Sequence, residues 1–203
     1  MSADIDEGGH GVSMVTDSPP DQVPRASSDP TLPPEDGPPE DAGRDLGLRI
    51  AADGEWLYQG SPIRRMELVK LFASVLRREA DGSYWLVTPV ERGRIAVEDA
   101  PFVAIELART GRGRQQLLRV RTNLDEWVPI GPRHPIRLRR PAGVVAGSGP
   151  APYVEVRDGL EARLARPVYY ELVDLAEEQV VHGRACTGVW SEGDFFALHK
   201  PGA

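Results

Sequence analysis

After Gly82 the chain consists of short runs of β-branched and aromatic residues, each ended by a turn signal, and this pattern restricts it to sheets with short connections. The first runs are 84–88, 94–97, 102–108 and 115–122. The later runs are a hairpin in YVEVRDGLEARLA around Asp158-Gly159, then PVYYELVDL, VHGRACTGVW, the turn SEGD, and FFALHK. Antiparallel meanders suit such connections, whereas parallel crossovers need helices that this region does not indicate.

Ahead of these strands, the segment SPIRRMELVKLFASVLRREADG predicts an amphipathic helix over 62–80. Ser61 can cap its first turn, Pro62 suits the first helical position, and Asp81-Gly82 supplies the stop. Apolar residues recur at spacings of three and four and predict one buried stripe, formed by Leu68, Leu71, Phe72, Val75 and Leu76. We expect this helix to cover a sheet.

The two halves of the strand region repeat a pattern, which indicates an internal duplication. GEWLYQGSPIR at 54–64 is similar to DEWVPIGPRHPIR at 125–137, and PFVAIEL at 101–107 is similar to PVYYEL at 167–172. The prediction is an α+β fold with two related antiparallel motifs, the first at 46–123 with one clear helix and the second at 124–203, mainly β. In the second motif LRRPAGVVAGSGPAP takes the place of the helix.

Residues 1–45 form an acidic, proline-rich segment that we expect to be disordered. They hold eleven acidic residues against two arginines, a net charge of −9, together with eight of the 19 prolines and no aromatic residue. Such a segment buries too little apolar surface to offset the entropy of ordering it. The remaining 22 basic and 20 acidic residues give a net charge near +2, so the chain's overall −7 indicates nothing about the partners of the folded part.

The run GSPIRRMELVKLFASVLRREADGSYWLVTPVERGRIAVEDAPFVA, with the later GVWSEGDFF, resembles the bacterial family catalogued as domain of unknown function 1285. The resemblance covers roughly residues 45 to 200, and the LVTPVE and VEDAPF blocks are its most specific parts. It implies an α+β protein of two related motifs with no established activity and a proposed role in signal transduction. The acidic N-terminal segment and the glycine-rich AGVVAGSG depart from the family pattern.

The carboxylates among the aliphatic residues of 84–107 are read first as parts of the fold. Glu106 and Glu171 fall at matching places in the two proposed copies, as solvent-side residues of alternating strands. The Glu98-Asp99-Ala100-Pro101 stretch suits a turn between strands. The alternative is a small hydrolase or lyase that uses Glu91, Glu98 and Asp99, with Arg94 holding an anion.

We therefore expect a non-enzymatic module that binds a small anionic ligand or a protein partner. The candidate site lies at the seam of the two motifs and draws on Trp56, Arg64, Glu91 and Arg94, with Glu98 and Asp99 as further candidates. Arg64 and Arg94 could grip a carboxylate or phosphate through their guanidinium groups. No residue is assigned a catalytic role, and no cofactor is implied.

Other motifs favour structure over chemistry. His182, Cys186 and His199 lack the paired spacing of a zinc site, and no metal is expected. Nine arginines between 109 and 140 suggest an anion-binding face, but aromatic residues are not interleaved with them, so nucleic acid is not an expected partner. No span is apolar enough for a membrane helix, the start lacks a secretory signal, and the lone cysteine forms no disulfide within the chain, so we expect a cytoplasmic protein. The sequence does not indicate an oligomeric state.

Overall fold

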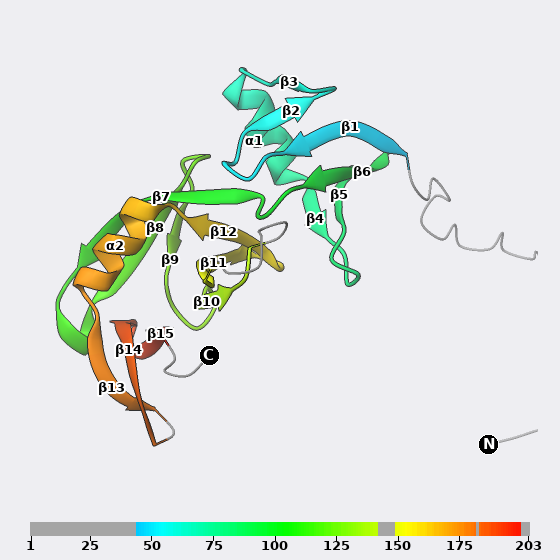
Figure 1. Cartoon of the computed structure of the whole chain (residues 1–203). Coiled ribbons are helices and arrows are strands. Elements are labelled where there is room, and N and C mark those ends of the chain that lie inside the picture. The colour runs from blue at the N-terminus through cyan, green and yellow to red at the C-terminus, as the bar shows by residue number, and fades with distance from the viewer. Residues whose placement is uncertain (1–43, 142–148, 182, 200–203) are drawn as a thin grey trace, which may run out of the picture. The chain divides into compact units, whose positions relative to one another are not determined.

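A computed structural model describes residues 44–141, 149–181 and 183–199 of the chain (Figure 1). The predicted disordered segment 1–45 lies outside these residues except for Arg44 and Asp45, and Asp45 begins the first strand. Within the described ranges no helix is long and apolar enough to span a bilayer.

Two six-stranded sheets form the bulk of the described structure. The first has the spatial order β3-β2-β1-β6-β5-β4 and the second β10-β11-β12-β7-β8-β9. The strands of the first sheet are β1 (Asp45–Ile50), β2 (Trp56–Tyr58), β3 (Ser61–Pro62), β4 (Leu76–Arg78), β5 (Tyr84–Val87) and β6 (Arg92–Val97). Those of the second are β7 (Phe102–Thr110), β8 (Leu117–Thr122), β9 (Trp127–Pro129), β10 (Ile136–Arg139), β11 (Ala151–Arg157) and β12 (Leu160–Leu164).

The two sheets have the same topology, and this confirms the predicted pair of related motifs in an α+β fold. Each sheet consists of two consecutive three-stranded meanders, and the first strand of one meander lies beside the last strand of the other. The short sequence matches between the two halves do not fall at equivalent positions of the two sheets. Trp56 lies on β2, inside its sheet, whereas Trp127 lies on β9, one of the two edge strands of the second sheet.

The expectation of wholly antiparallel sheets was wrong at one pair in each sheet. β1 runs parallel to β6, with Ile50 opposite Val97, and β12 runs parallel to β7, with Leu164 opposite Ala104. A parallel pair needs a long connection, usually one that contains a helix. Here the four strands between β1 and β6, together with α1, supply that length in the first sheet, and the four strands between β7 and β12 supply it in the second.

The first helix is shorter than predicted. Helix α1 spans Met66–Ser74, whereas Ser61–Pro62 pairs with β2 as β3 and Leu76–Arg78 pairs with β5 as β4. Both ends of the predicted helix 62–80 are therefore taken by the sheet, whose backbone pairing prevails over local helix signals. The buried stripe is also rotated, because Val69 and Ala73 are buried while Leu71 is 60% exposed.

A second helix replaces the strand expected in PVYYELVDL. Helix α2 spans Arg166–Asp174, with a proline in its first turn, and it buries Val168 and Leu172, which are four residues apart. Tyrosine and valine favoured a strand by composition, but the spacing of the buried residues is helical. Glu171 accordingly lies on this helix, so it is not the equivalent of Glu106, which lies on β7 and pairs with Arg121.

The C-terminal part adds a small antiparallel sheet. Its strands are β13 (Glu177–Val181), β14 (Arg184–Ser191) and β15 (Asp194–His199), in that spatial order. The predicted turns hold: Asp158 and Gly159 both have positive φ between β11 and β12, as do Glu192 and Gly193 between β14 and β15. A short 3-10 turn at Gly113–Gln115 joins β7 to β8.

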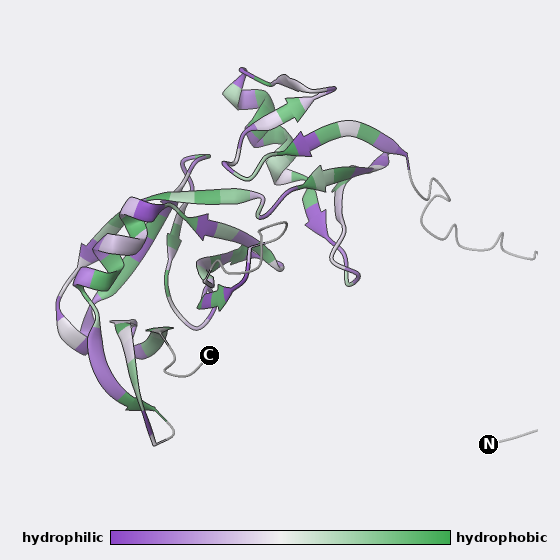
Figure 2. Ribbon diagram, viewed as in Figure 1, coloured by the Kyte–Doolittle hydropathy of each residue, from purple (hydrophilic) through white to green (hydrophobic). Residues whose placement is uncertain are grey.

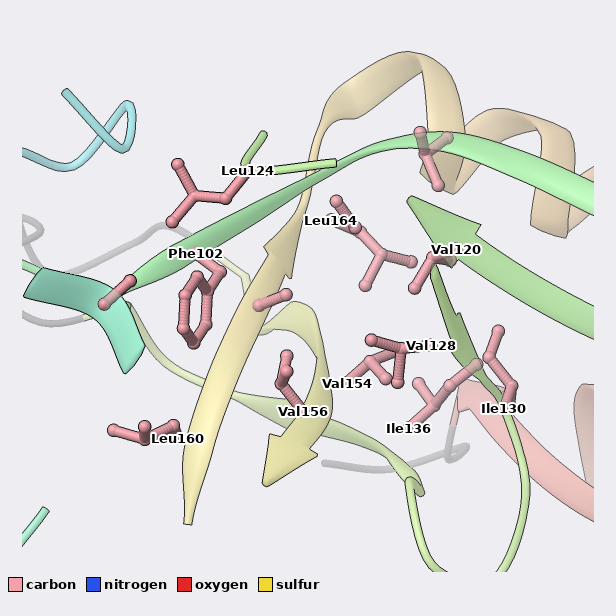
Figure 3. Packing of buried hydrophobic residues seen from close by; sticks show 14 of the residues in the cluster. Phe102, Val120, Leu124, Val128, Ile130, Ile136, Val154, Val156, Leu160 and Leu164 are labelled. Atoms are coloured by element: carbon pink, nitrogen blue, oxygen red, sulfur yellow. The ribbon is translucent and has the colours of Figure 1, made fainter. Parts of the chain in front are cut away.

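Alternation along the strands produces the core. Figure 2 shows hydrophilic and hydrophobic bands alternating along β1, in which Leu48 and Ile50 are buried. In the second sheet Phe102 of β7 belongs to a cluster of aliphatic side chains from the other strands and their connections (Figure 3). The labelled members of this packing are Val120, Leu124, Val128, Ile130, Ile136, Val154, Val156, Leu160 and Leu164.

Candidate functional site

A cavity of about 750 Å³ lies within the first motif, between α1 and strands of the first sheet. Its lining combines apolar side chains, which form its wall, with charged and polar residues that are exposed to solvent, and we call these exposed polar residues its mouth. The apolar lining comes from Leu46, Leu48, Ile63, Leu68, Phe72, Val75 and Leu86. The polar lining comes from Arg44, Asp45, Tyr58, Gln59, Thr88 and Glu91. A volume of this size is typical of sites for small molecules.

One side of the cavity is shaped by a bulge in β1. Asp45 lies opposite Arg94 of β6, but Arg49 lies opposite Ala96, so β1 has extra residues between these two pairs. Gly47 has φ +66, a backbone conformation that favours glycine, and its N–H donates to Asp45 Oδ1 at 2.8 Å. The bulge moves Leu46 and Gly47 out of regular pairing, and both line the cavity.

The opposite wall is one face of α1. Leu68, Phe72 and the cap residue Val75 repeat at helical spacing and line the cavity together. The ring of Phe72 also stacks on the ring of Trp56, and the two ring centroids are 6.2 Å apart. Trp56 is 2% exposed and does not line the cavity, so it supports this wall from within the core.

The polar side chains of the mouth are tied to one another. Arg44 and Glu91 form an ion pair at 3.3 Å between exposed side chains. Thr88 Oγ1 donates to the Glu91 carbonyl and accepts from the Glu91 N–H, which holds the loop that carries this carboxylate. Gln59 Nε2 donates to Tyr58 Oη at 3.3 Å. The mouth thus includes two carboxylates and one guanidinium.

The structure does not bring the candidate residues from the sequence into one site. Glu91 lines the cavity, while Glu98 accepts the Ala52 N–H and pairs with Arg49. Arg64 and Arg94 are exposed, on the connection after β3 and on β6 respectively. Contacts between the two motifs include the bond from the Arg157 guanidinium of β11 to the Ala73 carbonyl of α1. Ligand binding by the six candidates stays a prediction.

Asp99 lies in a buried polar network with residues of the second sheet. Its carboxylate accepts the Tyr153 hydroxyl at 2.7 Å and pairs with Arg139 at 3.3 Å and Arg163 at 3.2 Å. Arg139 also bonds the Asp99 carbonyl, pairs with Glu161 at 2.9 Å, and lies over the Tyr153 ring. Through these contacts Asp99 links the connection between the two sheets to β10, β11 and β12. Asp99 does not line the cavity.

The network predicts a loss of stability at alkaline pH. Burial and the hydrogen bond to Asp99 raise the pKa of Tyr153 far above its ordinary value of 10.0. Above pH 10 the unfolded chain therefore loses this proton while the folded chain keeps it, so the free energy of unfolding falls as pH rises. Urea titrations from pH 8 to about pH 10.5 measure this decline. The destabilisation caused by Tyr153→Phe should shrink over the same range, and a constant difference between the two proteins would contradict this origin.

The predicted arginine face is divided in the structure. Arg121, Arg137 and Arg139 form ion pairs with carboxylates. The guanidinium groups of Arg114 and Arg119 lie over the rings of Trp190 and Trp127. Three of the nine arginines are therefore paired with carboxylates within the fold, and the run does not present nine unpaired cations.

Sequence reasoning missed most of the cavity lining, and one local signal pointed to it. A glycine inside an alternating strand, Gly47 between Leu46 and Leu48, is typical of a bulge. The polar residues of the mouth, among them Asp45, Tyr58 and Thr88, carry no motif. In the described part of the chain no three His, Cys, Asp or Glu side chains are grouped to hold a metal ion, and His182 lies outside that part.

Comparison with known proteins gives two adjoining family matches. Residues 33–100 match the description "Domain of unknown function (DUF1285), N-terminal domain", and residues 101–198 match "Protein of unknown function (DUF1285), C-terminal domain". A crystal structure of a DUF1285 family protein from Silicibacter pomeroyi DSS-3 is 44% identical, with a TM-score of 0.69, over 77% of this chain and 81% of that one. Another, from Shewanella baltica OS155, is 30% identical, with a TM-score of 0.48, over 64% and 91%. No curated protein matches the chain.

Proposed function

The chain belongs to the DUF1285 family, and we propose that it is a binding module whose cavity beside α1 takes up a small, largely apolar molecule. The observation that carries this proposal is the cavity itself, which has a volume of about 750 Å³, an apolar wall that includes residues of α1 and the bulged β1, and exposed polar residues in its lining. Apolar walls supply affinity, and a few polar groups orient the ligand.

Binding without turnover fits the polar groups better than catalysis does. The alternative hydrolase or lyase needs Glu91, Glu98 and Asp99 to converge on one reacting molecule. Asp99 is instead held by Tyr153 and two arginines, and Glu98 by Arg49 and the Ala52 N–H. The family resemblance implies a role in signal transduction, and we keep this role in the proposal. A protein that senses a ligand has to bind it but does not have to convert it into a product.

A larger side chain in the cavity lining should weaken the uptake of an apolar probe. Leu68 projects into the cavity from α1, so Leu68→Trp should lower the affinity for the neutral dye N-phenyl-1-naphthylamine by at least about tenfold. The increase in dye fluorescence on titration measures this affinity. Leu71→Trp is the matched control, because Leu71 lies on the same helix, is 60% exposed and does not line the cavity.

Two further measurements keep this test decisive. Far-ultraviolet circular dichroism and the urea midpoint establish that the Leu68→Trp protein is folded, and Leu68→Phe provides a smaller filling side chain if it is not. Equal dye affinity in the wild-type, Leu68→Trp and Leu71→Trp proteins would place the dye elsewhere and refute the proposal.

A further inference from the structure

The mouth of the cavity is richer in negative than in positive charge. Asp45 and Glu91 contribute two carboxylates, and Arg44 contributes one guanidinium, which already pairs with Glu91 at 3.3 Å. Asp45 uses one carboxylate oxygen to accept the Gly47 N–H, which leaves its charge at the mouth. An anionic head group would meet two like charges there, and it would have to take Arg44 from Glu91.

Tyr58 adds a second feature that favours a cation. This residue is 50% exposed and lines the cavity, and its hydroxyl accepts a hydrogen bond from Gln59. A tyrosine ring beside a site attracts an ammonium group through its negative face. The carboxylates and the aromatic ring among the lining residues are complementary to a positively charged group, while the aliphatic lining is complementary to a hydrocarbon chain or ring.

We infer that the ligand is a cationic amphiphile, a molecule with an apolar body inside the cavity and a protonated amine at the mouth. This inference rests on the proposed function and specifies the ligand class of the same site. It replaces the small anionic ligand expected from Arg64 and Arg94, because neither arginine lines the cavity.

The test compares three probes with the same hydrocarbon chain and different head groups. Octylamine, octanol and octanoate are titrated at neutral pH against the protein loaded with N-phenyl-1-naphthylamine, and dye displacement reports their affinities. Octylamine should bind about fivefold more tightly than octanol, and octanoate more weakly than both. Raising the salt concentration should reduce the advantage of the amine, because the carboxylates at the mouth are exposed.

Charge variants at the mouth test the same inference without changing the apolar wall. Glu91→Gln should lower octylamine affinity about fivefold. The double variant Asp45→Asn with Glu91→Gln should reverse the preference towards octanoate, because Arg44 is then the one charge left among the lining residues given above. Asparagine at position 45 can still accept the Gly47 N–H, so the bulge is kept. Glu55→Gln is the control, since Glu55 is exposed at the opposite end of the β1–β2 hairpin.

The outcomes separate the two proposals. The cationic ligand is supported if octylamine displaces the dye from the wild-type protein at a lower concentration than octanol or octanoate, and if the double variant prefers octanoate. Octanoate binding as tightly as octylamine to the wild-type protein would overturn the ligand class and leave the apolar cavity as a binding site. Failure of all three probes to displace the dye would overturn both.

Discussion

Replacing Asp99 by asparagine is expected to lower the free energy of unfolding by about 3 kcal/mol. The Asp99 side chain is 2% exposed and pairs with Arg139 and Arg163, so the substitution removes the charge from a buried site that two guanidinium groups face. Asparagine has nearly the same shape and still accepts the Tyr153 hydroxyl. We expect the lower end of the range for broken buried pairs, because the arginine side chains are 31% and 35% exposed and water solvates them in part.

Urea denaturation measures this loss, and the neighbouring Glu98→Gln is its control. Glu98 also bonds an arginine, but its side chain is 41% exposed, so the expected change is below about 1 kcal/mol. The slope of unfolding free energy against urea should stay the same in both variants, which shows that the surface exposed on unfolding is unchanged. Similar losses for Asp99→Asn and Glu98→Gln would contradict a buried structural role for Asp99.

The strands could be predicted because β-branched and aromatic residues are concentrated in short runs between turn signals. Tyr84–Val87, Phe102–Thr110 and Leu117–Thr122 lie within a few residues of their predicted bounds. The turns at Asp158-Gly159 and Glu192-Gly193 could be placed because their backbone needs positive φ, which few residue types adopt readily.

The pairing of distant strands could not be predicted from these local signals. A parallel contact between β1 and β6, or between β7 and β12, depends on which strand ends meet after the whole meander has formed. The same reason explains the shortened α1, because Ser61–Pro62 and Leu76–Arg78 join the sheet through partners elsewhere in the chain. Helix α2 is a different case, since the spacing of Val168 and Leu172 was visible and strand propensity was given more weight.

Of the residues that line the cavity, the sequence singled out Glu91, but for a site at the seam of the two motifs, and it missed the apolar wall. Leu68, Phe72 and Val75 were recognised as a buried helical stripe, but the same pattern describes a side chain packed in a core and one facing a cavity. The difference is set by the bulge in β1, which holds that strand out of regular pairing with β6. The hydrophobic pattern of one segment does not show whether a cavity is left between that segment and the one it packs against.

Trp56→Ala is expected to lower the free energy of unfolding by about 3 to 5 kcal/mol, because it empties a large volume in the core. Trp56 is 2% exposed and stacks on Phe72, so its loss also removes the support behind the cavity wall. Trp127→Ala is the matched comparison, since the sequence pairs the two tryptophans and Trp127 is 40% exposed on an edge strand. We expect it to cost about 1 kcal/mol or less.

Trp56→Phe adds a diagnostic to this pair. The Trp56 Nε1–H is buried and has no acceptor among the described residues, so the smaller ring gives up packing but also removes an unsatisfied donor. Its loss of stability should therefore be well below that of Trp56→Ala, and urea midpoints of the three variants give the order. If Trp56→Ala and Trp127→Ala proved equally costly, the sequence echo would describe equivalent core positions after all. The expected inequality follows from topology, in which β2 lies inside its sheet and β9 at the edge.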